Sequence, residues 1–267
     1  GLVYNRPSAH IPLGTAPNNV VGRTRLATEV RRMTINPPAA AAVCVADADD
    51  ADFGLRSRVN AEGGTAIAYP QGSGTASTSG SEITGALSGI PDYDGSVEKV
   101  FGMKWSELRS MADVSTADAA TGLPDKVADY SMVVIKGDVT FDSTRPLKGL
   151  GVVIVQGNCT IAASSNSFFN GLLYVEGDLT VRAPAILSGQ IIVNGNCDVR
   201  GSTGDFVEIE FDSGIVTLLL TRMGQYRYSK SIFSPSRHLI DGRPTELHKS
   251  QRRLGTGYEV GLAGSGG

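Results

Sequence analysis

Long apolar runs, grouped histidines and phosphate-binding signatures are all missing from this chain of 267 residues. No apolar stretch approaches the roughly 18 residues that a membrane-spanning helix needs. The three histidines, His10, His238 and His248, are far apart, and none has the helix-spaced partner of a zinc site. The Gly- and Ser-rich stretch 72–81 lacks the lysine of a phosphate loop. The sequence therefore predicts no zinc site, no nucleotide phosphate site and no cofactor.

A strong net charge is also missing, except toward the C-terminal end. The chain carries 24 basic and 27 acidic residues, with 41% hydrophobic residues, as in an ordinary soluble protein. Residues 222–253 differ, because eight basic residues outnumber two acidic ones there. We predict a basic extended tail over 226–267, which either docks on an acidic protein or lipid surface or lies on the chain's own acidic body. No nucleic-acid-binding motif accompanies these charges, so no nucleic-acid partner is expected.

The chain does contain a repeat. Four eleven-residue phrases, SMVVIKGDVTF, GVVIVQGNCTI, GLLYVEGDLTV and GQIIVNGNCDV, begin at Ser131, Gly151, Gly171 and Gly189. Their shared glycines are separated by 20, 20 and 18 residues, and are Gly137, Gly157, Gly177 and Gly195. Self-similarity at such a period is typical of a solenoid, in which each repeat is one turn and its neighbours complete its core.

The pattern within each phrase predicts strands. The third, fifth, ninth and eleventh positions are apolar and largely β-branched, and polar residues flank the central glycine. The central Gly-Asp or Gly-Asn pair predicts a corner, because these residues tolerate positive φ. Connectors of seven to nine residues are too short for a crossover helix but leave room for a third short strand. We therefore predict a mainly β protein, a parallel β-helix with about 18–20 residues per coil.

The second and fourth positions of the phrases should point away from the core, yet most of them are apolar. An apolar outer face must be covered, either by the chain's own N-terminal segment, which we favour, or by a partner protein. The fourth column is our candidate interaction site, and it consists of Val134, Ile154, Tyr174 and Ile192.

These patterns divide the chain into three predicted regions. They are an N-terminal α+β region of strands, loops and short helices that packs on and caps the solenoid (1–130), the parallel β-helix (131–225) and the basic tail (226–267). Within the first region, 20–36 alternates like a strand or hairpin, and 92–119 has the apolar spacing of one or two short helices. We expect these helices to cover the first coil, whose open edge would otherwise pair with other chains. Residues 205–224 are predicted to form two further strands.

The cysteines are predicted to be free thiols. Cys159 and Cys197 occupy the same position of the second and fourth phrases, two coils apart. Two coils span about 9.6 Å, whereas a disulfide needs Cα atoms within about 7 Å. Both should therefore be buried as small apolar residues. Cys44 is alone in its segment, so no disulfide framework is indicated.

One acidic cluster is a calcium candidate. Asp47, Asp49, Asp50 and Asp52 stand close together, and hard cations take several carboxylates from a flexible loop. The glycine and terminal glutamate of an EF-hand are missing, however. A solvated acidic turn is our prediction, and calcium is the alternative.

Carbohydrate chemistry is the enzymatic alternative, because glycoside hydrolysis uses paired carboxylates. The outward acids Asp138, Glu176 and Asp178 belong to a ladder that recurs at every corner, whereas an active site breaks a repeat. We therefore predict no enzyme and no catalytic residues. A carbohydrate-active β-helix enzyme and a phage- or adhesin-type carbohydrate-binding protein remain alternatives.

A family resemblance accompanies the repeat. The phrase G-[hydrophobic]₃-V-x-G-[DN]-x-T-[IV], at Gly151 and Gly171, resembles the C-terminal β-helix of PilX-like type IV pilus assembly proteins and, more distantly, of bactofilins. The stretch VVGRTRLATEVRRM from Val20 is similar to the strand after the membrane helix of the PilX-like family, and the order of the pieces over 18–225 is similar too. The family's N-terminal hydrophobic helix has no counterpart in these residues. Conversely, the tail 226–267 has no counterpart in the family.

The resemblance implies a non-enzymatic structural component of a bacterial surface or envelope assembly, pilus-associated or a filament subunit. Its partners would be other protein subunits, including further copies of itself, and it would reach a membrane only through an N-terminal anchor absent from these residues. Its location would be the cell envelope or extracellular surface, on the periplasmic side. A bactofilin-like cytoskeletal polymer is the structural alternative, although bactofilins are nearly pure β-helices without some 130 preceding residues.

Overall fold

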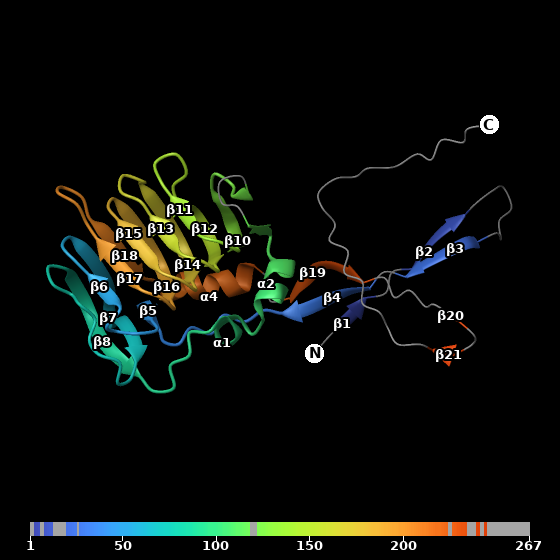
Figure 1. Cartoon of the computed structure of the whole chain (residues 1–267), viewed down its shortest axis with the longest axis horizontal. Helices are drawn as coiled ribbons and strands as arrows, with labels where there is room; N and C mark the ends of the chain where they lie inside the picture. The colour runs from blue at the N-terminus through green and yellow to red at the C-terminus, as the bar shows by residue number, and fades with distance from the viewer. Residues whose placement is uncertain are drawn as a thin grey trace. The chain divides into compact units, whose positions relative to one another are not determined.

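A computed structural model describes residues 3–5, 8–12, 20–25, 27–117, 122–223, 226–233, 239–240 and 243–244 (Figure 1). The chain divides into two compact units: Gly1–Arg32 together with Tyr226–Gly267, and Met33–Gln225. The second unit contains all four repeats.

The second unit is a parallel β-solenoid of about eight turns, which confirms the fold predicted from the repeats. Successive phrases pair position by position, so that Gly151 lies beside Gly171, and Gly171 beside Gly189. The strands of the larger sheet, in stacking order, are β9 (Val114–Thr116), β10 (Val127–Ile135), β12 (Lys148–Val155), β14 (Ser167–Val175), β16 (Ala185–Val193), β5 (Ala41–Val45) with β18 (Val207–Phe211), β7 (Ser57–Pro70) and β8 (Glu82–Ile90). The smaller sheet contains β11 (Val139–Phe141), β13 (Cys159–Ile161), β15 (Leu179–Arg182), β17 (Cys197–Arg200) and β6 (Ala51–Phe53).

Each repeat builds one turn from a long bent strand and a short strand. In the third repeat these are β14 and β15, and β14 bends at Gly171, whose φ is 145°. Before the bend, burial alternates between neighbouring residues, and after it every residue of β14 is buried. The apolar end of each connector therefore does supply a strand, but as the first half of a long one.

The corner glycines lie one above another, as predicted, although for a different reason. The N–H of Gly177 donates to the carbonyl oxygen of Gly157 over 3.2 Å, and that of Gly195 to Gly177 over 3.1 Å. None of these corner glycines has a positive φ. Instead, a Cβ at Gly177 would lie 2.9 Å from the backbone of Gly157, closer than real Cβ contacts come. Close stacking, rather than left-handed backbone, is what requires glycine here.

One turn of the solenoid is assembled from two distant parts of the chain. After β16, the first half of the next turn is β18, paired through Leu187 and Ile209. Its second half is β5, paired through Ile192 and Cys44. β7 then pairs with both β18 and β5, and β8 pairs with β7 (Figure 1). The N-terminal strands thus continue the stack that the repeats begin.

The predicted boundary of the β-helix at residue 131 therefore differs from the structure. Residues 41–90 form turns of the solenoid rather than a cap on it. Residues 56–59 and 65–69 have the composition of short strands. The Gly-Asp corner that identifies a repeat is absent there, so the sequence did not show that these strands stack on the others.

The predicted helices are present and run along the outside of the stack. α1 (Val97–Phe101) and α2 (Trp105–Met111) connect β8 at one end of the solenoid to β9 at the other. α1 follows Ser96, although no side-chain cap bond forms there. Trp105 is partly buried and packs edge-on against Tyr174.

The second of the two strands predicted in 205–224 is instead a helix, α4 (Ser213–Arg222). The side chain of Asp212 accepts a hydrogen bond from the backbone N–H of Ile215 over 3.0 Å and so begins the helix as its N-cap. Leu219 is fully buried, and Ile215 and Met223, four residues to either side of it, pack against the same outer cluster, which is the spacing of one helix face.

The buried residues form two clusters on opposite sides of the bent strands. The interior cluster fills the solenoid and includes the third, fifth, ninth and eleventh positions of the phrases. The outer cluster lies between the strands and the helices. Fully burying one Val, Leu or Ile side chain contributes about 1.5–3 kcal/mol to stability. Side chains on both faces of the bent strands therefore contribute burial energy.

The first unit is a separate group of strands. β4 (Ala27–Arg32) pairs antiparallel with β1 (Val3–Asn5) and with β19 (Tyr226–Phe233). The other pairs are β2 (Ser8–Pro12) with β3 (Val20–Arg25), and β20 (Leu239–Ile240) with β21 (Arg243–Pro244). The start of the predicted basic tail is therefore a strand, and most of the tail after Phe233 lies outside the described residues.

Candidate interaction sites

The predicted interaction column is covered by the chain itself. Val134, Ile154, Tyr174 and Ile192 are each 0% exposed. They pack in the outer cluster with α1, α2, α4 and residues 33–41. The interaction-site prediction is therefore wrong and the favoured alternative, self-coverage, is correct, because α1 and α2 lie on this face and remove it from solvent.

Polar contacts fix the cover in one position. Gln190, the single polar residue of the second column, is 3% exposed and donates to the carbonyl oxygen of Ala39 over 2.7 Å. The side chain of Arg109 in α2 donates to Gln156 over 2.8 Å. A buried amide without a partner costs about 1–3 kcal/mol, so these contacts select one docking register for the covering segments.

Tyr174 is the centre of the covered face. Its hydroxyl donates to Glu176 over 2.6 Å and accepts from the Asn194 amide over 2.7 Å, and Asn194 also reaches the carbonyl oxygen of Gly95. The Phe101 ring packs edge-on, with ring centroids 5.3 Å apart. Burial, followed by the Glu176 carboxylate, raises the pKa of Tyr174 far above its usual value. The group is a neutral structural hydroxyl, and Glu176 is one of its supports.

A side-chain ladder runs along the corner beside the stacked glycines. The side-chain oxygen of Asp138 accepts from the backbone N–H of Asn158 over 2.8 Å. Asn158 accepts from Asp178 in the same way, and Asp178 from Asn196, each over 2.8 Å. Asp and Asn alternate freely here because either side chain offers the accepting oxygen. These acids therefore cap the next coil.

A second ladder crosses the smaller sheet and absorbs one residue of the calcium candidate. Asp198 accepts from Arg182 over 2.6 Å and from Arg200 over 2.9 Å, and Arg200 also pairs with Asp52. Partial burial opposes ionisation of Asp198, but the two guanidinium groups outweigh it and lower its pKa. Asp52 is thus held by an arginine rather than turned toward the other aspartates.

The other aspartates of the calcium candidate do not converge either. Asp47 accepts from the backbone N–H of Asp49, and Asp49 accepts from that of Thr75 over 3.2 Å. Across the described ranges, no group of three or more Asp, Glu, His or Cys side chains is placed to hold a metal ion. The prediction of an acidic turn fits this geometry better than the calcium alternative.

All three cysteines are buried free thiols. Cys159 and Cys197 lie in one interior column with Leu179 between them, as the repeat predicted. Burial raises the pKa of each thiol to about 12, so none is a thiolate near neutral pH. They serve as small apolar residues of the two clusters.

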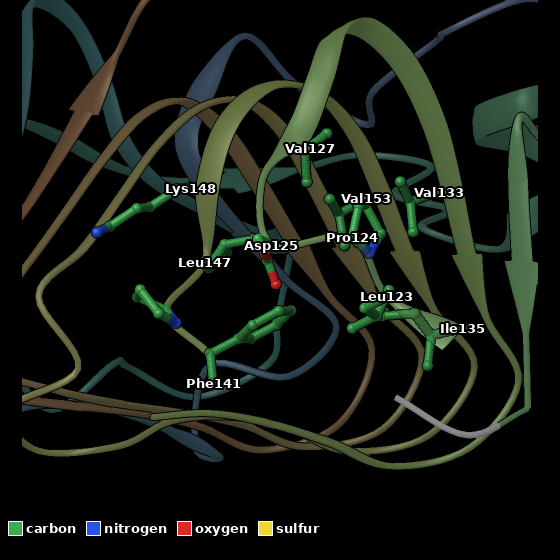
Figure 2. Close-up of a pocket in the computed structure, with 11 residues that line it drawn as sticks. Leu123, Pro124, Asp125, Val127, Val133, Ile135, Phe141, Leu147, Lys148 and Val153 are labelled. Carbon is green, nitrogen blue, oxygen red and sulfur yellow. The ribbon is translucent and has the colours of Figure 1, made fainter. Parts of the chain in front are cut away.

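The β9 end of the solenoid is covered. Leu123 and Pro124 lie over the interior of the first coil, facing Ile135 and Phe141 (Figure 2). The hollow between them has a free volume of about 10 Å³, roughly what one water molecule occupies. It is too small for an organic ligand, and its apolar lining continues the interior cluster.

The β8 end is different. β8 has nine residues and pairs with β7 along one edge, and no other described strand pairs with its outer edge. Ile83 and Leu87 pack against the interior cluster but stay partly exposed at this end. An open strand edge is a template for pairing with another chain. The sequence pattern did not predict this site, because residues 82–90 lack the Gly-Asp corner of the repeats and fell outside the predicted solenoid.

Comparison with protein-family models, with curated proteins and with solved structures found no match to this chain. Among the described residues, no helix is long and apolar enough to cross a membrane. The residues and the fold therefore carry the functional argument by themselves.

Proposed function

We propose that this protein is a non-enzymatic structural component of a bacterial surface or envelope assembly, pilus-associated or a filament subunit, and that it acts through protein–protein contacts of its β-solenoid. The observation that carries the proposal is the uncovered edge of β8, nine residues long. The lateral apolar face is buried under the chain's own helices, so contacts with other proteins would form at this end.

The roles of the outward acids support a structural function. Glu176 receives hydrogen bonds from Tyr174 and Asn194, and Asp178 receives the backbone N–H of the next coil. Both carboxylates thus support the fold at positions that the repeat shares. A glycosidase instead needs a pair of carboxylates flanking a bound sugar.

The proposal is tested by fractionating the source bacterium. An epitope tag on the full-length gene product allows immunoblotting of sheared surface filaments, envelope and cytosol, with a cytosolic protein as the control. We expect the tagged protein in the sheared or envelope fraction, within a particle much larger than a single chain. Recovery as a free single chain in the cytosol would overturn the proposal.

A hydrolysis assay separates the enzymatic alternative. The purified chain and its Glu176→Gln variant are incubated with a panel of bacterial and plant polysaccharides, and new reducing ends are measured. We expect no release by either protein. Release by the native chain that Glu176→Gln abolishes, with the circular dichroism spectrum unchanged, would replace the structural role with a carbohydrate-active one.

A further inference from the structure

β8 lacks the features that usually protect an edge strand. Edges are commonly blunted by short length, lysine, proline or several charges. β8 has nine residues, a single charged residue in Glu82, and neither lysine nor proline. β9, which closes the opposite end, has only three residues. The difference suggests that β8 has a partner for which a long, weakly charged edge is suited.

The burial of the strand is symmetric within two residues of its bend. Gly85, with φ 121°, is the corner residue. Two residues to either side, Ile83 and Leu87 both pack against the interior cluster. One residue to either side, Thr84 and Ala86 are both exposed. Over residues 83–87 the inward and outward positions are therefore the same whichever direction β8 is read from Gly85.

We propose that β8 pairs antiparallel with β8 of a second copy of this chain, around a two-fold axis through Gly85. This axis reverses the strand while keeping the inner side of the bend on the inside. Ile83 of one copy then lies opposite Leu87 of the other, so the two interior clusters become continuous. The second copy would be a partner for the proposed structural role, and the inference rests on that proposed role.

Three observations favour a second copy over another occupant. The symmetry about Gly85 makes the edge complementary to itself, as a two-fold interface requires. The one charged residue, Glu82, would lie opposite Ser88 rather than another carboxylate, and it is already paired with Arg58 of its own chain over 2.8 Å. The opposite end is covered by Leu123 and Pro124, so β8 pairing by itself joins two copies, and this pair would be the unit that enters a larger assembly.

Matched double variants at the exposed positions test the pairing. Thr84→Glu with Ala86→Glu places two carboxylates opposite two others across the axis. Thr84→Lys with Ala86→Glu places ammonium groups opposite carboxylates at the same positions. By sedimentation equilibrium we expect the unaltered full chain and the Lys/Glu variant to be dimers, and the Glu/Glu variant to have a dissociation constant raised about tenfold or more.

Disulfide trapping tests the register. Residues opposite each other in an antiparallel pair have Cα atoms about 4.5–5.5 Å apart, within the range of a disulfide. We expect Thr84→Cys chains mixed with Ala86→Cys chains to give a crosslinked dimer under mild oxidation, and either variant alone to give at least severalfold less.

The outcomes that overturn the inference are distinct from failure of the proposed function. A monomer at all concentrations, or a dimer insensitive to the Glu/Glu change, would show that β8 does not pair with itself. In each case recovery of the protein from a surface assembly would still support the structural role, with a different protein paired to β8.

Discussion

At Gly171 and Gly189 the backbone of one coil passes so close to the coil before it that no side chain fits between them. Their φ angles are 145° and 122°. A Cβ on Gly171 would overlap the carbonyl oxygen of Gly151, and one on Gly189 would overlap that of Gly171. Positive φ and steric exclusion therefore act together at this bend.

We predict that Gly171→Ala lowers the free energy of unfolding by roughly 3 kcal/mol or more, because the clash adds to backbone strain. Gly204→Ala is the control, since Gly204 has φ 111° but a Cβ added there would have no atom within 4 Å. Its cost should be the strain alone, about 1–3 kcal/mol. Urea unfolding of both variants measures the difference, and equal losses would show that the close approach is unimportant.

The ionisation of the Asp198 carboxyl makes the free energy of unfolding depend on pH. The Arg182 and Arg200 guanidinium groups lower its pKa despite partial burial. A carboxylate with a lowered folded-state pKa stabilises the fold above its unfolded value, near 3.9, and loses that contribution as the pH falls through its folded value.

We therefore predict that unfolding free energy falls between about pH 5 and pH 2, and that Asp198→Asn flattens part of that fall. Urea titrations at a series of pH values measure both curves. Parallel curves for the two proteins over this range would contradict a stabilising charge at Asp198.

At this scale the sequence predicted where the corners lie but not why they are glycine. The Asp and Asn residues after Gly137 and Gly157 were expected from turn chemistry, and they do occupy the corner. Their bonds to the next coil, such as Asp138 to Asn158, depend on stacking. The residues of one repeat do not show which atoms of the next coil these side chains will bind.

Among the elements, α1 and α2 bury the apolar outer face of the bent strands. Phe101 of α1 is fully buried against Tyr174. The alternation of the phrases predicted only that the second and fourth columns point outward. Their apolar character then indicated a cover, and the spacing of 92–119 indicated helices, but the sequence did not connect the two.

We predict that Phe101→Ala lowers the free energy of unfolding by about 3–5 kcal/mol, because it leaves a cavity between α1 and the strands. Phe168→Ala is the matched control, since Phe168 is 51% exposed on β14 and its loss should change stability by no more than about 0.5 kcal/mol. Chemical unfolding of both proteins provides the comparison. Similar values for the two would contradict the assignment of α1 as a required cover.

The segment 213–222 was predicted to be a strand but is the helix α4. The run 215–220 is apolar except for Thr217, and its apolar residues carry no periodicity that distinguishes a strand from a buried helix. The deciding feature is local: Asp212 caps the N-terminus, and tertiary packing buries Leu219. A capping residue before the apolar run was the available signal.

At the scale of the whole molecule, one turn of the solenoid is completed by two segments that are far apart in the sequence. β18 follows the last repeat, β5 precedes the helices, and together they complete one turn. Strands paired with β5 and β18 then continue to β8. The fold class was predictable because four copies repeat a pattern, whereas the N-terminal turns share the stacking without sharing the sequence.

The most direct test of this arrangement is disulfide trapping across the smaller sheet, where Asp52 of β6 pairs with Asp198 of β17. Neighbouring coils are about 4.8 Å apart, within disulfide range, whereas two coils span about 9.6 Å. Thr180 lies in the same column one coil farther from Asp52.

We predict that the variant with Asp52→Cys and Asp198→Cys forms an intramolecular disulfide, seen as faster migration on non-reducing gels and confirmed by peptide mass mapping. The variant with Asp52→Cys and Thr180→Cys should remain reduced under the same mild oxidation. Absence of the first crosslink, or equal formation of the second, would contradict the stacking of the N-terminal strands on the repeats.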